Sequence, residues 1–213
     1  MTRENCKITK DTIFQILFDR LVSGYYPIGF RLTEQMFSSE FNISRTPIRE
    51  VLHQLASLRL LVLNPNKSAE VIGLSCDDVE EMYDLRIVLE QYALEAAIVN
   101  IKLQELSALK SRIEAITLDT DLDVLAKNDY ALHMYIANCS GKPRLKSILE
   151  QLFTLLIRNS SFPIADRIQQ NRDEHLQIIE AMFNRDIVLA KAKLKEHLEH
   201  SKANAVEFIF RKV

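Results

Sequence analysis

The sequence predicts a mainly α-helical protein with an N-terminal winged helix-turn-helix and a C-terminal antiparallel all-helical bundle of about six helices. Three helical patterns and then two short apolar runs occupy residues 1–74, which is the element order of a winged helix-turn-helix. Three of the four glycines lie in the first 73 residues, so the rest of the chain holds few residues that break helices. We therefore expect two domains, residues 1–74 and 75–213.

Local signals mark each element of the first domain. Apolar spacing and turn residues predict three helices, over 8–22, over 34–41 and from 45 onward, and two strands of a hairpin, over 60–63 and 69–72. Thr33 is a good N-cap for the second helix and Ser44 for the third. Pro47 lies in the first turn of the third helix, where a missing amide costs little.

The second domain consists of long helical patterns separated by short breaks. Ser75 and Asp78 form a capping-box-like start. Six helices are predicted, over 77–101, 104–117, 121–139, 143–160, 164–183 and 186–211.

Composition excludes several classes of protein. With 47% apolar residues the 213-residue chain is not disordered, and no uncharged apolar run approaches the ~18 residues of a membrane span. The N-terminus lacks the apolar region of a signal peptide. Cys6, Cys76 and Cys139 lie too far apart for a disulfide framework or a paired-cysteine metal motif, which suits a reducing compartment. We expect a cytoplasmic protein.

Charge separates the two domains. The net charge of −2 argues against a general binder of polyanions. Residues 1–74, however, carry nine basic and seven acidic side chains and are net positive, whereas the second domain is net negative. A contact with nucleic acid is therefore expected from the first domain.

The start of the third helix carries residues suited to reading DNA. In a helix-turn-helix the N-terminal residues of the recognition helix meet base edges in the major groove. Arg45 and Arg49 share one helix face, and arginine is the commonest bidentate reader of guanine. The hydroxyls of Ser44 and Thr46 suit phosphates, and Lys67 at the predicted wing tip suits a phosphate or the minor groove. For any single arginine, a solvated charge on an ordinary helix is the alternative.

The sequence segments around these residues are a more specific signal than any single residue in them. The segments 28–34 (Ile-Gly-Phe-Arg-Leu-Thr-Glu) and 41–52 (Phe-Asn-Ile-Ser-Arg-Thr-Pro-Ile-Arg-Glu-Val-Leu) resemble the DNA-binding domain of GntR-family transcription regulators. The resemblance covers residues ~10–74 and implies a winged helix-turn-helix that binds double-stranded DNA. Because one recognition helix reads few bases, we expect a homodimer on a palindromic operator.

Four potential metal ligands lie on apolar stripes of three predicted helices and so point inward: Asp129, His133, His175 and His197. His200 lies on a charged stripe and is expected to face water. Buried acids and imidazoles need partners, and a shared metal ion is one such partner. A single buried histidine is more often a hydrogen-bonded core residue, but the four residues together favour a metal site.

Spacing strengthens this prediction. Asp129 and His133 lie four residues apart, one turn along the same helix face. His175 and His197 are equally far from the turn predicted between their helices, about 16 Å at ~1.5 Å per residue. If the two helices are antiparallel, both side chains therefore lie at the same level along the helix axes. One carboxylate and three imidazoles suit a divalent ion, zinc foremost with nickel or manganese as alternatives, with open positions for water.

The same positions belong to a family pattern. The segments 129–133 (Asp-Tyr-Ala-Leu-His), 140–143 (Ser-Gly-Lys-Pro), 173–179 (Asp-Glu-His-Leu-Gln-Ile-Ile) and 195–198 (Lys-Glu-His-Leu) resemble the FadR-type C-terminal ligand domain, called FCD. This resemblance covers residues ~77–211 and implies an antiparallel helical bundle. Many of its members bind a metal through one aspartate and three histidines, and all four positions are present here. Six helices are typical of the shorter, VanR-like subgroup.

Arg86 is one more inward charge. It lies on the apolar stripe of the first long helix, where a guanidinium needs an anion. The segment 85–90 (Leu-Arg-Ile-Val-Leu-Glu) resembles the FCD pattern whose arginine faces a bound carboxylate, which implies an effector-binding role for Arg86. An internal salt bridge, for example to Glu90 or Asp129, is an equal alternative.

Together these features predict a transcription regulator, a repressor rather than an activator, and not an enzyme. Its helical domain is expected to bind a divalent metal ion and a small organic acid that modulates DNA affinity. A metal-dependent hydrolase is one alternative, because such a ligand set can activate water. However, the chain has no HExxH motif, and Glu174 is expected to point about 100° away from the metal. A DNA-binding protein with a purely structural metal is the other alternative.

Overall fold

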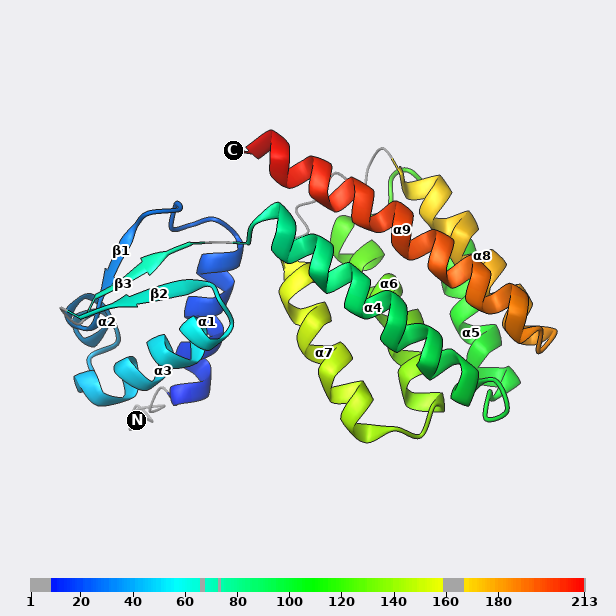
Figure 1. Ribbon diagram of the computed structural model, residues 1–213, viewed down its shortest axis with the longest axis horizontal. Helices are drawn as coiled ribbons and strands as arrows, with labels where there is room; N and C mark the ends of the chain where they lie inside the picture. The colour runs from blue at the N-terminus through cyan, green and yellow to red at the C-terminus, as the bar shows by residue number, and fades with distance from the viewer. Residues whose placement is uncertain (1–8, 66–67, 73, 159–166, 213) are drawn as a thin grey trace, which may run out of the picture. The chain divides into compact units, whose positions relative to one another are not determined.

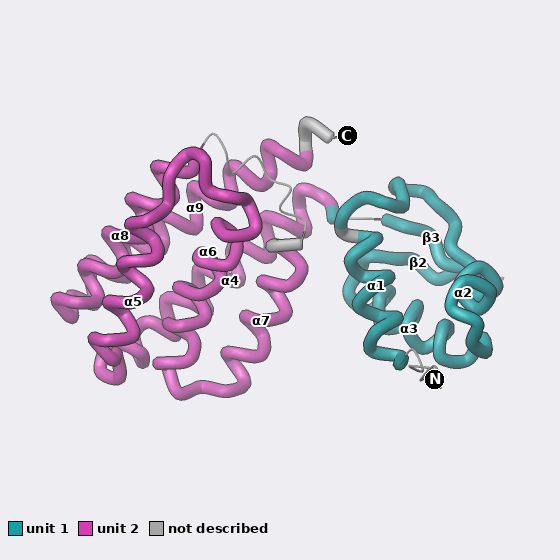
Figure 2. The backbone as a smooth tube through the Cα atoms, turned by 180° about the vertical axis from the view of Figure 1, so that it is seen from behind, with its two compact units in different colours: residues 1–74 teal, residues 75–213 magenta. Residues whose placement is uncertain are grey.

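The computed structural model describes residues 9–65, 68–72, 74–158 and 167–212 (Figure 1). The chain forms two compact units, residues 1–74 and 75–213, drawn in teal and magenta in Figure 2. No helix in the described part of the chain is long and apolar enough to cross a membrane.

The first unit is a winged helix-turn-helix with a three-stranded sheet. Its elements are α1 (Lys10–Val22), β1 (Arg31–Thr33), α2 (Glu34–Phe41), α3 (Arg45–Ser57), β2 (Leu61–Asn64) and β3 (Ser68–Val71). The strands are antiparallel in the order β1-β3-β2. β1 was not predicted, because three residues carry no alternation signal. It forms by pairing with β3, where Arg31 lies opposite Glu70.

Caps set the ends of the helices in the helix-turn-helix. The Thr33 hydroxyl accepts a hydrogen bond from the amide of Met36 at 3.2 Å, as expected of an N-cap. Asn42 ends α2 in the left-handed conformation, with φ 51°. Ser44 holds the N-cap position of α3, but its hydroxyl makes no capping bond, unlike the expectation. The hydroxyl is exposed beside the first turn of α3.

The second unit is a bundle of six helices in its described residues, which confirms the predicted fold class. These are α4 (Cys76–Ala97), α5 (Leu103–Glu114), α6 (Leu122–Cys139), α7 (Pro143–Arg158), α8 (Ile168–Phe183) and α9 (Ile187–Lys212). α4 packs against α6, α7 and α9, and α8 packs against α5 and α9 (Figure 1). The core between them includes the fully buried Leu94, Leu132 and Phe153. Helices α4, α6, α8 and α9 therefore enclose one interior.

A reciprocal capping box starts α4. The Ser75 hydroxyl accepts from the amide of Asp78 at 3.1 Å, and the Asp78 carboxylate accepts from the Ser75 amide at 3.0 Å. Replacing Ser75 by alanine should lower the free energy of unfolding of this unit by about 1 kcal/mol, because an N-cap bond is lost. Chemical denaturation followed by circular dichroism measures this. Ser111→Ala, at an exposed position within α5, is the control and should cause no such loss.

Candidate metal centre

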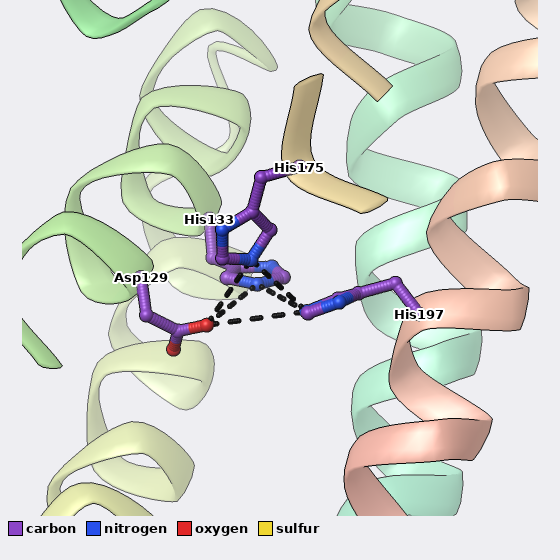
Figure 3. A group of neighbouring side chains, drawn as sticks. All are labelled: Asp129, His133, His175 and His197. Carbon is purple, nitrogen blue, oxygen red and sulfur yellow. Dashed lines mark hydrogen bonds and ion pairs between the residues drawn. The ribbon is translucent and has the colours of Figure 1, made fainter. Parts of the chain in front are cut away.

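Four side chains from three helices converge inside the second unit (Figure 3). Asp129 and His133 come from α6, His175 from α8 and His197 from α9. One ligand atom of each lies within 4.8 Å of the others. The three imidazoles are at most 2% exposed, and Asp129 is partly buried. The structure thus brings together the four residues predicted from the helical stripes.

The distances within this cluster suit a shared ion. The Nε2 atom of His197 lies 3.3 Å from Nε2 of His133 and 3.2 Å from Nε2 of His175. Oδ1 of Asp129 lies 3.3, 3.6 and 3.9 Å from Nε2 of His175, His133 and His197. Two nitrogens bound to one zinc ion at ~2.0–2.1 Å in tetrahedral geometry are roughly 3.3–3.4 Å apart. The residues present therefore fit a divalent ion.

Two glutamates that were not predicted as part of the site contact the outer nitrogens of these rings. Glu90 of α4 contacts Nδ1 of His133 through Oε2. Glu174 of α8 contacts Nδ1 of His197 through Oε2 at 2.9 Å. Glu174 was expected to point about 100° away from the metal, but the packing of α8 against α9 brings its carboxylate against His197. Glu90 lies 43 positions from His133 and Glu174 lies 23 positions from His197, so no local sequence signal reveals either contact.

His200 was expected to face water. Its side chain is 43% exposed, and its Nδ1 also lies 2.7 Å from Oε1 of Glu174. Glu174 also accepts two bonds from Nη2 of Arg167, at 2.9 and 3.1 Å. His200 therefore belongs to the surroundings of the centre although it is not one of the four converging residues.

Burial and the carboxylates set the protonation of the cluster. Burial opposes protonation of His133, but Glu90 and Asp129 outweigh it and raise the pKa of His133 to about 9. Burial, together with the adjacent His175, lowers the pKa of His197 to about 3. Burial acts to raise the pKa of Asp129, but His133 and His175 hold it well below its ordinary value. The ionised carboxylates thus favour a positive charge among the imidazoles. A bound cation would also supply this positive charge.

Arg86 lies inside the bundle and is 3% exposed. Its Nε donates to Oε1 of Glu90 at 2.8 Å, so the internal salt bridge that was the alternative role is present. Its guanidinium carbon lies 4.0 Å from the ring centroid of Phe153. The Nη2 atom is buried and has no hydrogen-bond partner among the described residues. The salt bridge therefore leaves one donor of Arg86 unused.

The residues predicted to read DNA lie on the outer face of α3. Apolar side chains bury its inner face: Ile48, Val51, Leu52 and Leu55. The predicted contact residues are all exposed: Ser44, Arg45, Thr46 and Arg49. Two bonds hold Arg49 to Glu34 of α2, Nε to Oε1 at 2.6 Å and Nη2 to Oε2 at 2.9 Å, and Arg45 donates to Gln35. Lys67 lies outside the described residues.

Comparison with known proteins matches two family models to separate parts of the chain. Residues 9–71 match the model of the gntR family of bacterial regulatory proteins, and residues 81–200, more than half of the chain, match the model of the FCD domain. An uncharacterized HTH-type transcriptional regulator of Bacillus subtilis, YdhC, is 26% identical over 92% of this chain and 93% of its own length. The gluconate operon transcriptional repressor of Bacillus subtilis is 27% identical over 84% of this chain and 78% of its own length.

Solved structures share the fold. McbR/YncC of E. coli has a TM-score of 0.72 at 20% identity and covers 93% of this chain and 97% of its own. The structure titled Zn2+-bound FCD domain of TM0439 has a TM-score of 0.51 at 23% identity, over 65% of this chain and 99% of its own.

The two matched domains and these relatives are those of regulators and not of enzymes, so the hydrolase alternative is wrong. From the winged helix-turn-helix, the helical bundle and both domain matches, it follows that this chain belongs to the GntR family of transcription regulators and carries an FCD domain.

Proposed function

We propose that this regulator is a cytoplasmic repressor that binds a palindromic operator as a homodimer. Its helical unit holds a divalent metal ion, zinc foremost, and a small carboxylate that changes DNA affinity. The convergence of Asp129, His133, His175 and His197 in one buried cluster carries the proposal. Repression is supported by the gluconate operon repressor among the relatives. The palindrome and the dimer are supported by the single recognition helix that each chain contributes.

The metal is supported by the donor set and by a related domain. Three imidazoles and one carboxylate suit zinc, and nickel or manganese is also compatible. A domain of the same fold has been solved with Zn2+ bound. Elemental analysis of protein purified without chelators tests the proposal, and we expect about one divalent ion per chain. Protein without any divalent ion would contradict it.

The carboxylate effector is supported by the unused donor of Arg86. A buried N–H group without an acceptor costs free energy, and an anion that enters the bundle removes this cost. A bound divalent ion adds a second positive charge close by, and four protein ligands leave room for an anion when the ion is five- or six-coordinate. A small carboxylate matches both groups, because its two oxygens accept from a guanidinium and can coordinate a metal.

Arg86→Lys is expected to weaken carboxylate binding by at least tenfold, because lysine keeps the charge that balances Glu90 but loses the planar fork. Isothermal titration of metal-loaded protein with dicarboxylates and hydroxy acids measures this. Lys110→Arg, at a partly exposed position on α5, is the control and should bind as the wild type does. Unchanged affinity in Arg86→Lys would contradict the placement of the effector.

The purely structural metal remains the second candidate function, because the salt bridge from Arg86 to Glu90 already balances the buried charge. DNA affinity measured with and without the bound carboxylate separates the two. A change supports a sensor, since a ligand shifts an equilibrium only when it prefers one state. Equal DNA affinity in both cases supports a structural metal.

A further inference from the structure

Glu90 lies behind one of the three converging histidines. It is fully buried on α4, and its Oε2 contacts Nδ1 of His133. Its other oxygen, Oε1, accepts from Nε of Arg86 at 2.8 Å. Both oxygens are therefore engaged, and the carboxylate is held in one orientation against the imidazole.

Glu174 has a similar arrangement behind a second converging histidine, His197. Its Oε2 lies 2.9 Å from Nδ1 of His197, and its Oε1 lies 2.7 Å from Nδ1 of His200. Arg167 donates to both of its oxygens, at 2.9 and 3.1 Å. Each glutamate thus joins one converging histidine to one arginine, and the two glutamates come from different helices, α4 and α8.

We propose that Glu90 and Glu174 are positioning residues of the metal centre. Each accepts a hydrogen bond from the Nδ1–H group of one ligand histidine. This inference rests on the proposed metal binding. A proton held on Nδ1 leaves Nε2 with its lone pair free, and Nε2 is the atom that meets the other ligands in this structure. The contact also fixes the rotation of the ring.

Charge gives the glutamates a second effect on the ion. A carboxylate hydrogen-bonded to an imidazole makes the ring a stronger donor toward a metal. Arg86 and Arg167 in turn form ion pairs with the two buried carboxylates. The order arginine, glutamate, histidine therefore occurs twice, once from α4 to α6 and once from the start of α8 to α9.

Glu174→Gln is the first test, because glutamine keeps the size and an acceptor oxygen but removes the charge. We expect zinc affinity to fall about 10–100-fold, as measured by competition with a chromophoric chelator. The absorption spectrum of the Co2+-loaded protein should change as well, because the ligand field responds to ring orientation. Glu180→Gln is the matched control, since Glu180 lies on the same helix, is exposed and pairs with Lys110 at 3.2 Å. It should bind zinc as the wild type does.

Glu90 needs a paired variant, because removing its charge alone leaves Arg86 buried without a counter-ion. Arg86→Gln/Glu90→Gln replaces the pair by two neutral amides, of which only the one at position 86 is smaller than the residue it replaces. We expect a 10–100-fold loss of zinc affinity here too. Thermal melting of the metal-free proteins shows whether each variant is folded.

The outcomes separate the inference from the proposal on which it rests. Wild-type protein that takes up no zinc or Co2+ overturns the metal centre and the positioning role together. Tight binding by the wild type, with equal affinity and an equal Co2+ spectrum in Glu174→Gln and in the paired variant, overturns only the positioning role. A lower metal-free melting temperature with unchanged metal affinity also overturns it, because that is the result of a merely structural contact.

Discussion

Replacing His175 by alanine is expected to lower metal affinity by more than about 100-fold. His175 presents Nε2 to both His197 and Asp129, at 3.2 and 3.3 Å, so its loss removes one of the four converging ligand atoms. Changes to residues behind a metal ligand already cost 10–100-fold, and the loss of a ligand itself should exceed this. Purified His175→Ala should therefore contain much less than one metal ion per chain.

The loss of metal should also lower stability. A ligand present at about 100 times its dissociation constant stabilises the folded state by about 2.7 kcal/mol. For a domain of this size, losing that stabilisation lowers the melting temperature by roughly 5–10 °C. Elemental analysis and thermal melting with added zinc measure the two effects. His53→Ala, on α3 in the other unit, is the control and should leave both unchanged. A full complement of metal in His133→Ala/His175→Ala would refute the site.

Replacing Arg45 by alanine is expected to weaken operator binding by about 30-fold or more. A bidentate contact between an arginine and a base contributes ~1–3 kcal/mol, and a dimer makes it twice, so the expected loss is about 2–6 kcal/mol. Arg45 is exposed at the start of α3, where a recognition helix meets the bases, and its present partner is a neutral amide, Gln35. Selectivity for the base that it contacts should relax at the same time.

A gel-shift titration at one fixed salt concentration measures both effects. Arg112→Ala removes the same charge from an exposed position on α5 and is the control, because it changes the net charge without touching α3. Equal operator affinity in wild type and Arg45→Ala would show that the residue does not contact DNA. A loss that is equal on operator and on random DNA would assign Arg45 to phosphates instead of bases.

Local patterns were enough for most of the secondary structure. Helix caps and apolar stripes involve residues three or four apart, so the sequence shows them directly. The expected ends of α2, the capping box at Ser75 and the six helices of the second unit all follow from such short-range signals. β1 was missed because a three-residue strand is made by its partner, β3, about 37 residues further along the chain.

The inward orientation of the four converging residues was also readable from the sequence. A residue that shares a stripe with apolar neighbours must point into the bundle, since the stripe is buried as a whole. The equal distances of His175 and His197 from their turn then bring the two rings to the same height in an antiparallel pair. The sequence therefore determined that these four side chains meet inside the bundle.

Only the tertiary structure decided what surrounds those side chains. The contact of Glu90 with His133 joins residues 43 positions apart, and that of Glu174 with His197 joins residues 23 apart. Arg86 was equally compatible with a salt bridge to Glu90, one turn along the same helix, and with a bound anion; the structure shows the salt bridge and leaves Nη2 unpaired inside the bundle. The physical reason is that periodicity sets the face on which a side chain lies. Its partners depend on the rotation and axial offset of the neighbouring helices, which no single helix encodes.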